Sequence, residues 1–520
     1  MDGSTGDKGF DADLLIIGGG INGAGIARDA AGRGLRVVLC EKGDLASGTS
    51  SASTKLIHGG LRYLEHHEFG LVRAALSERE VLLGNAPHII WPLRFILPQS
   101  PGVRPAWLIR LGLFLYDHLG ARKRLPGSGT FSLTDTPQGA PLKPELTKAA
   151  YYSDCWVDDA RLVVLNALDA KERGATILTR TECLRTVPEG KGWRATLLDR
   201  RTGKESDVHA RVVVNAAGPW AEKCMAGVIE GAPVTPLRLV RGSHIIVPGL
   251  FDHDDAYIFQ NPDKRIVFAI PYEHNFTMIG TTDEDFDGNL DEVRASAREV
   301  DYLLETANRF FQQQIANSDI VWSFSGVRPL LGGGSDDAKE VTRDYRLDLG
   351  RSAEGAPVLS ILGGKITTYR KLAEQAVAGL TAVLDIHAGP WTATAPLPGG
   401  DVADGDMDAY ARTLVELYPW LPEDLRQRYV RTYGTRTPAL LQGAHGMADM
   451  GRNFGAGLYE REVRYLVAEE WAVTAEDILW RRTKLGLHGR NSLADDLQRW
   501  LDTLPEHKSN EQRSLPERTS

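Results

Sequence analysis

A glycine-rich turn near the N-terminus has the residue types and spacing that bind a dinucleotide. Residues 13–17 form an apolar run, and Gly18, Gly20 and Gly23 follow as G-x-G-x-x-G. The first glycine permits a tight strand-to-helix turn, the second lets a pyrophosphate approach, and the third lets helix and strand pack closely. Glu41 lies 23 residues after Gly18, where a carboxylate can hold a ribose hydroxyl. An acid there disfavours a 2′-phosphate, so the pattern predicts FAD or NAD rather than NADP.

A second stretch of small residues, 44–65, favours FAD over NAD. It is dense in Ser, Thr and Gly and then becomes basic and aromatic. Small residues let backbone and hydroxyl groups approach a diphosphate and a flavin ring closely, whereas an NAD domain more often continues into another strand–helix unit. We therefore predict that Ser50, Ser51 and Gly59 contact FAD.

Further strands must return the chain to this cofactor. The apolar run 210–215 predicts a buried strand that ends in NAAGPW, where Gly218 allows close backbone contact. Another run, 358–362, leads into GGKITTYRKLA, which predicts a strand, a glycine turn at Gly364 and a helix. The dinucleotide fold is therefore predicted to be discontinuous in sequence.

The intervening segments predict two further parts. Residues 236–350 contain several strand patterns and one long helix at about 291–313, which is typical of an antiparallel α+β domain. From residue 396 the pattern is mainly helical. The predicted fold class is α/β plus α, with a Rossmann-like FAD-binding domain (1–85, 151–235 and 351–395), an antiparallel substrate domain (86–150 and 236–350), a C-terminal helical domain (396–505) and a disordered tail (506–520).

Composition excludes several classes of protein. The chain has 520 residues, more than one core usually supports, and its net charge of −9 argues against nucleic acid as a partner. Its four cysteines have neither C-x-x-C nor zinc-ligand spacing, so we predict reduced thiols and no metal site. No apolar run approaches 18 residues and the N-terminus lacks a signal peptide, so we expect a cytoplasmic protein without a membrane span.

Several longer motifs resemble those of FAD-dependent glycerol-3-phosphate dehydrogenases. They are IGGGINGAGIARDAAGRG (17–34), SSASTKLIHGGLRYLE (50–65) and GGKITTYRKLA (363–373), with shorter similarities at 152–163, 215–220, 241–248, 280–283, 325–330 and 433–437. The resemblance covers nearly the whole chain. It implies oxidation of sn-glycerol 3-phosphate to dihydroxyacetone phosphate, by hydride transfer to N5 of a non-covalently bound FAD.

Three cations are candidates for holding the substrate phosphate. Arg62, Arg328 and Lys365 each stand in a turn with glycine neighbours, and Arg and Lys are the usual donors to phosphate. From the pattern alone each is as well explained as a surface cation, but the resemblance implies that all three line the substrate site. Arg328 is also a candidate for stabilising alkoxide charge, and Tyr63 and Thr282 are weaker candidates for contacting substrate hydroxyls.

Two histidines are candidates for the catalytic base. His58 precedes Gly59 in the cofactor loop, and His244 begins a predicted strand in RGSHIIV. An unperturbed imidazole titrates near pH 6.5, which suits a base at neutral pH. Either residue is equally well explained as a hydrogen-bonded structural histidine, and we assign the base to His58 with His244 as the alternative.

The electron acceptor is not read from any motif. The resemblance implies a membrane quinone and peripheral attachment to the cytoplasmic membrane. Residues 104–124 combine an apolar stretch containing Trp107 with basic flanks, which suits a lipid interface or equally a buried helix. A homodimer is considered as the assembly.

Three other functions compete with this hypothesis. A glycerophosphate oxidase would use the same substrate with oxygen and release peroxide. An amino-acid or sarcosine-type oxidase shares the scaffold, but three candidate cations favour a phosphate over a single carboxylate. A non-catalytic flavin-binding interaction protein is disfavoured by the candidate base and phosphate cations.

Overall fold

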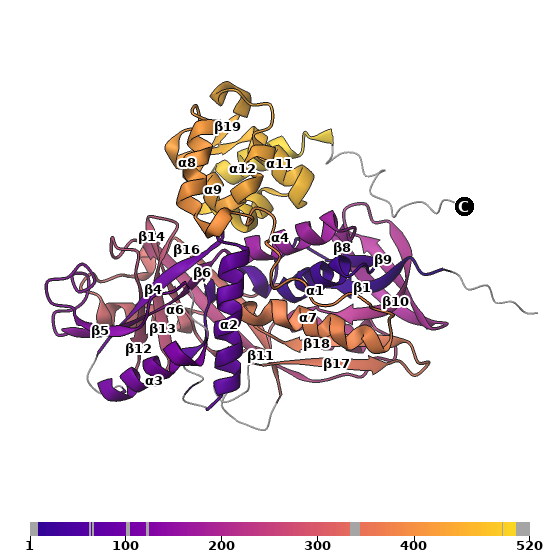
Figure 1. Cartoon of the computed structure of the whole chain (residues 1–520), viewed down its shortest axis with the longest axis horizontal. Helices are drawn as coiled ribbons and strands as arrows, with labels where there is room; N and C mark the ends of the chain where they lie inside the picture. Colours follow the sequence, from indigo (N-terminus) through magenta and orange to yellow (C-terminus); the bar gives the residue numbers. More distant parts are fainter. Residues whose placement is uncertain are drawn as a thin grey trace, which may run out of the picture.

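The computed structural model describes residues 9–61, 64, 67–99, 104–120, 124–332, 344–490 and 492–505. Two large β-sheets lie side by side, and a mainly helical C-terminal unit stands on top of them (Figure 1). Segments far apart in the sequence meet in both sheets.

The first sheet carries the glycine turn. Its central strands run in parallel, with the apolar residues of β1 and β2 buried, as expected for a sheet covered on both faces. An antiparallel hairpin, β8–β9, extends from β10. The strand order is β17 (Tyr345–Arg351), β18 (Pro357–Gly363), β10 (Glu205–Asn215), β1 (Ala12–Ile17), β2 (Val37–Cys40) and β7 (Thr176–Leu178), with β8 (Thr181–Glu189) and β9 (Gly192–Asp199) off this path.

Three helices cover one face of this sheet: α1 (Ile21–Gly32), α4 (Asp159–Glu172) and α7 (Tyr369–Gly379). Helix α1 lies between the other two and contacts both. The Asp158 carboxylate caps α4 by accepting the Arg161 backbone N–H at 3.1 Å, which explains why the helix begins there.

The second sheet is almost entirely antiparallel: among the described strands, only β4 and β12 pair in parallel. Helices α2 (Phe69–Asn85), α3 (Ala106–Leu119) and α6 (Ala297–Phe310) pack around it. Its strands are, in order, β15 (Glu284–Asp285), β11 (Leu237–Pro248), β14 (Phe276–Gly280), β13 (Ile266–Tyr272), β12 (Ala256–Gln260), β4 (Ile90–Pro98), β6 (Lys148–Val157) and β3 (Leu56–Ile57), with β16 (Trp322–Leu331) beside β11 and β5 (Gly129–Ser132) beside β6.

Two strands cross domain boundaries suggested by the sequence. Strand β6 spans residue 151 yet lies wholly in the second sheet, and β17 spans residue 350 yet pairs with β18 in the first. The long helix expected at about 291–313 is shorter, because Ser296 and Glu299 form a capping box that starts α6 at Ala297. The domain boundaries themselves remain a prediction.

The C-terminal unit has its own hydrophobic core. Val463, Leu466, Ile478 and Leu479 are buried in this core, but they lie on two helical segments, since Trp471 has a φ of +56° and ends α11. The elements are α8 (Met407–Leu417), α9 (Glu423–Tyr433), α10 (Thr437–Leu440), α11 (Glu460–Glu470), a π-helix (Asp477–Arg482), α12 (Leu493–Leu501) and a small hairpin of β19 (Asn453–Gly455) and β20 (Leu458–Tyr459).

Candidate active site

The predicted glycine turn connects β1 to α1. Gly18 has a φ of +113°, and a Cβ atom there would lie 2.6 Å from the Ala216 carbonyl oxygen. A Cβ atom on Gly23 would lie 2.0 Å from the Gly18 carbonyl oxygen. Both positions therefore require glycine. Gly20 is the N-cap of α1, and the Ser50 hydroxyl accepts the Ile21 backbone N–H at 3.0 Å, so Ser50 lies at the helix N-terminus, where anions bind.

The Glu41 carboxylate lies beside this turn, at the end of β2. It accepts the backbone N–H of Gly19 at 2.7 Å and that of Gly43 at 2.8 Å. Burial raises the pKa of Glu41 above its ordinary value, against the lowering effect of these two hydrogen bonds. The carboxylate thus joins the glycine turn after β1 to the loop after β2. It lies in the position predicted for holding a ribose hydroxyl.

Two further glycine turns meet the first at the carboxyl ends of parallel strands. Gly218 follows β10, with a φ of +55°. Gly364 follows β18, with a φ of +104°, and the Asn22 side-chain amide of α1 donates to the Gly363 carbonyl at 3.2 Å. Ligands of open parallel sheets bind at such ends. Among the described residues, the buried Asn22 Oδ1 has no hydrogen-bond partner, which fits a polar ligand beside it.

The loop from Thr49 to His58 is held from two sides. The Thr49 hydroxyl donates to the Val327 carbonyl of β16 at 2.6 Å. On the other side, the buried Lys55 ammonium donates to Asp159 at 2.8 Å and to the Ser51 carbonyl at 2.9 Å. The sequence did not lead us to predict this pairing of Lys55 with Asp159, although both residues lie in the family motifs. The available signal was a lysine within a Ser-rich loop.

His244 is a buried residue of β11 that contacts this loop. Its Nε2 lies 3.0 Å from the Thr54 hydroxyl, and its ring stacks on Phe324 with centroids 4.7 Å apart. Burial, then the nearby charges of Lys55 and Arg328, lower the pKa of His244 to about 3. The imidazole is therefore neutral at pH 7 and a weak proton acceptor, which argues against His244 as the base.

His58 lies where the loop meets the turn after β18. Its backbone N–H donates to the Thr367 hydroxyl at 3.2 Å, two residues after Lys365. The next residue, Gly59, donates its N–H to the Tyr116 hydroxyl at 2.7 Å. The structure thus brings the loops that carry His58 and Lys365 into contact. Arg62 and Tyr63 lie outside the described residues.

Arg328 projects from β16 beside this loop. Its Nη2 donates to the Thr282 carbonyl at 2.9 Å and lies 2.7 Å from Asp283 Oδ1. The Thr282 hydroxyl instead donates to Glu299 at 2.6 Å and accepts the Ser243 N–H at 2.9 Å. This hydroxyl donates its only proton to Glu299 of α6, and its contact with a substrate hydroxyl stays a prediction.

Comparisons with known proteins place this geometry in a family. The model of the FAD dependent oxidoreductase family matches residues 13–370, and that of the C-terminal domain of alpha-glycerophosphate oxidase matches residues 390–513. The chain is 52% identical to a glycerol-3-phosphate dehydrogenase of Pseudomonas aeruginosa, over 95% of this chain and 96% of that one. It belongs to the FAD-dependent glycerol-3-phosphate dehydrogenase family.

Two more relatives of this family extend the comparison. A D-erythritol 1-phosphate dehydrogenase of Brucella abortus is 53% identical, over 94% of this chain and 97% of that one. The solved glycerol-3-phosphate dehydrogenase of Bacillus halodurans, complexed with FAD, superposes with a TM-score of 0.74 at 29% identity, over 95% of this chain and 90% of that one. The predictions of family, fold class and FAD are confirmed.

An ionic cluster that sequence reasoning missed joins the family's C-terminal region to the cofactor loop. Asp44, three residues after Glu41, accepts from Arg482 at 2.8 and 2.9 Å and from Arg481 at 2.7 Å. The three side chains are nearly or wholly buried. The only signal was the two adjacent arginines, which a single sequence cannot pair with an acid 437 residues away.

Proposed function

We propose that the protein oxidises sn-glycerol 3-phosphate to dihydroxyacetone phosphate and passes the electrons to a membrane quinone. The observation that carries the proposal is that the loop of His58 contacts both the turn that carries Lys365 and the strand β16 that carries Arg328, beside the glycine turns. A dianionic phosphate needs cations, and a secondary alcohol needs a base.

Each residue has a separate task. Arg328 and Lys365, with Arg62, hold the phosphate, while His58 accepts the hydroxyl proton of the substrate. His244 remains neutral and, through its contact with the Thr54 hydroxyl, orients the substrate or the loop from Thr49 to His58. FAD, when bound, accepts the carbon-bound hydrogen as hydride. The glycine turns, Glu41, Ser50 and Ser51 hold that cofactor.

A second substrate is supported by the 53% identity to a D-erythritol 1-phosphate dehydrogenase. Both substrates are phosphorylated polyols with a secondary hydroxyl, so the same cations and base serve either. The two substrates differ by one hydroxylated carbon, and a site that hydrogen-bonds this extra hydroxyl can discriminate strongly between them, so a test must compare both.

The test is anaerobic mixing of the purified protein with each phosphate, followed at the flavin absorbance band. We expect fast bleaching with glycerol 3-phosphate. Faster bleaching with D-erythritol 1-phosphate would assign the second substrate, and no bleaching with any polyol phosphate would contradict the proposed function. Under air, stoichiometric peroxide would identify an oxidase instead of a quinone-linked enzyme.

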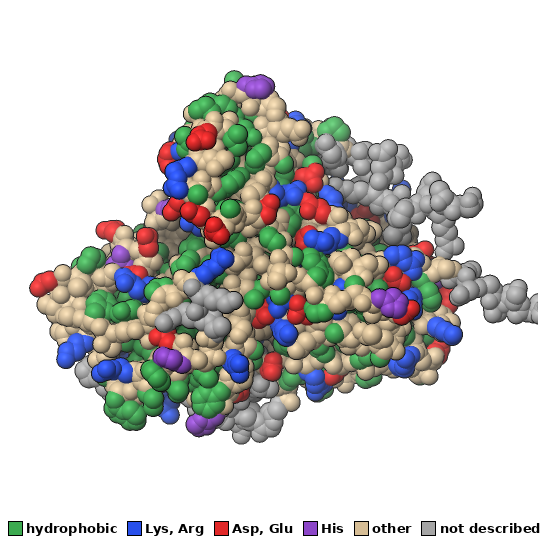
Figure 2. All heavy atoms as spheres, viewed as in Figure 1, with side chains coloured by type: hydrophobic (Ala, Val, Ile, Leu, Met, Phe, Trp, Pro, Cys, Tyr) green, Lys and Arg blue, Asp and Glu red, His purple; other side chains and the backbone are tan. Residues whose placement is uncertain are grey.

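Peripheral membrane contact through α3 is part of the proposal. Among the described residues no helix is long and apolar enough to cross a membrane. Helix α3 buries Ile109, Leu113 and Tyr116, whereas Trp107 is 66% and Phe114 57% exposed. Figure 2 shows apolar side chains gathered at the lower left edge, over the position of α3 in Figure 1. Such a face, with the exposed Arg110 and Arg124 nearby in sequence, suits a lipid interface.

A further inference from the structure

Helix α3 also reaches inward to the loop that carries the proposed base. The Tyr116 hydroxyl, on the buried face of α3, accepts the Gly59 backbone N–H at 2.7 Å. A Cβ atom on Gly59 would lie 2.6 Å from that hydroxyl and 2.5 Å from Leu76 of α2. The peptide next to His58 is therefore packed directly against α2 and α3.

A buried ion pair sets the orientation of this hydroxyl. Tyr116 donates its only proton to Asp154 of β6, with O–O distances of 2.7 and 2.9 Å. Asp154 in turn accepts from Arg79 of α2 at 2.6 Å, and Arg79 also donates to the Ser153 carbonyl at 3.1 Å. Because the proton goes to the carboxylate, the Tyr116 oxygen presents a lone pair to Gly59.

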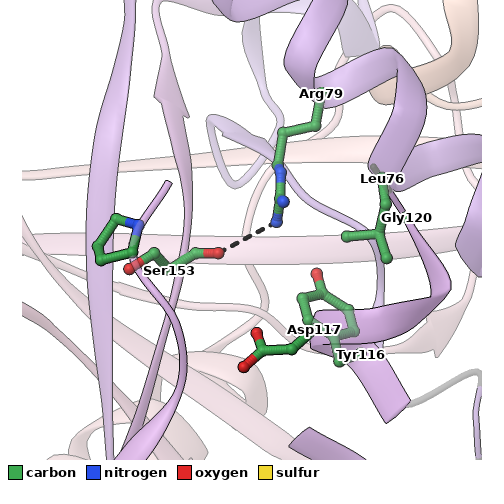
Figure 3. Close-up of a pocket in the computed structure, with 7 residues that line it drawn as sticks. Leu76, Arg79, Tyr116, Asp117, Gly120 and Ser153 are labelled. Carbon is green, nitrogen blue, oxygen red and sulfur yellow. Dashed lines mark hydrogen bonds between the residues drawn. The ribbon is translucent and has the colours of Figure 1, made fainter. Parts of the chain in front are cut away.

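The side chains of the network, Arg79, Tyr116 and Asp154, are buried. Figure 3 shows Arg79 and Tyr116 reaching toward one another from α2 and α3, at the edge of a cavity of about 10 Å³. This volume is at the lower limit for one water molecule. Burial, then the Asp154 charge, raises the pKa of Tyr116 well above its ordinary value, so the hydroxyl stays protonated.

We propose that Tyr116 is a positioning residue for the reaction: held by Asp154 and Arg79, its hydroxyl fixes the Gly59 peptide and thereby the direction in which His58 presents its imidazole. The inference rests on the proposed function, in which His58 takes the substrate proton. On its other side the His58 peptide is held by Thr367, so the base stands between two hydrogen-bonded anchors.

The test is Tyr116→Phe, which keeps the ring and removes the hydroxyl. A displacement of about 1 Å can cost roughly 100-fold in rate, so we expect the limiting rate of anaerobic flavin bleaching to fall about 10- to 100-fold, while the dissociation constant for dihydroxyacetone phosphate changes less than about threefold. The bleaching signal comes only from FAD-loaded molecules, so partial unfolding does not affect the rate.

Tyr152→Phe is the matched control, because its ring packs edge-on against Tyr116, with centroids 5.4 Å apart, in the same buried cluster. It should bleach at the wild-type rate. A Tyr116→Phe rate within about twofold of the control would overturn the inference. If Tyr116→Phe does not load FAD, Asp154→Asn is tested in its place. A bleaching rate about 10- to 100-fold below the control would support the inference, and a rate within about twofold of the control would overturn it. If wild-type protein itself is not bleached, the proposed function fails instead.

Discussion

The Arg328 guanidinium lies 2.7 Å from the Asp283 carboxylate while its side chain stays 27% exposed. It is thus oriented by a carboxylate yet still accessible to a ligand.

Arg328→Ala should retain FAD but lose glycerol 3-phosphate oxidation by roughly 30- to several-thousand-fold, since removing a charged partner from a buried anion costs about 2–5 kcal/mol. Steady-state kinetics with a soluble dye acceptor measures this. Arg298→Ala, whose side chain is 89% exposed, is the control, and equal kinetics in both variants would make Arg328 merely structural.

The two histidines should separate in transient kinetics. His58→Gln should slow anaerobic flavin bleaching by about 100- to 10,000-fold, the usual value of general-base catalysis, with a smaller effect on product binding. His244→Gln should slow it far less, because the pKa of His244 is already lowered to about 3 by burial. The reverse result would transfer the base to His244.

His88 predicts a loss of stability in acid. It is fully buried, and burial, then Arg161 and Arg431, lower its pKa to about 3 from 6.5. Between these values the unfolded chain binds more protons, so the free energy of unfolding falls as pH falls, by about 1.4 kcal/mol per pH unit. His88 alone should thus cost about 2 kcal/mol between pH 6.5 and pH 5.

Urea unfolding at both pH values measures this cost. His88→Gln should show a smaller acid shift of the unfolding midpoint than wild type. His387→Gln, at a side chain that is 85% exposed, should leave the shift unchanged. Identical shifts in wild type and His88→Gln would show that other groups cause the acid sensitivity.

Removal of the Asp44 charge should destabilise the C-terminal junction. Asp44→Asn removes the hydrogen-bonded carboxylate of the wholly buried Arg482, whereas Arg481 keeps Asp477 and Glu476. Breaking such a buried pair costs about 3–5 kcal/mol. We expect a lower unfolding midpoint and faster release of FAD. Asp291→Asn, which removes an exposed pair with Lys42, should cost at most about 1 kcal/mol; a similar loss in both variants would exclude a special role for the cluster.

Changing Arg122, Lys123 and Arg124 together to Glu should move the protein from the membrane to the soluble fraction, because each basic residue contributes about 1 kcal/mol near an anionic surface. Trp107→Ser with Phe114→Ser should do the same. Turnover with a soluble dye should persist while quinone-coupled turnover falls. Leu417→Ser, at an exposed residue of α8, is the control. Unchanged fractionation would place any attachment elsewhere.

The sequence could predict the glycine turns because their requirements are local. A strand, three glycines and a helix specify the turn at Gly18 within a few residues, and the close approach of Gly23 to Gly18 follows from it. The FAD loop and the return of the chain at Gly364 were predicted for the same reason, since each couples a glycine turn to an apolar run.

Long-range partnerships could not be predicted. Tyr116 lies 57 residues from Gly59, and nothing in the α3 pattern distinguishes a tyrosine that bonds the loop from one that fills the core. The weak basicity of His244 also depends on pairing across β11, β14 and β16, which sets its burial. The partner of Thr282, Glu299, lies in helix α6, and no local pattern in the sequence links these two residues.

Because the first sheet is discontinuous in sequence, its strands are synthesised at widely separated times. The contact between Asn22 and Gly363 joins residues 341 positions apart. At about 5–20 residues per second, the ribosome needs roughly 20–70 s to add that stretch. The glycine turn after β1 is therefore incomplete until β18 has been synthesised, and until then the edge of β10 is unpaired. We expect the cofactor to bind only after this point in biosynthesis. Scarcity of the cofactor would then affect chains that already extend past β18.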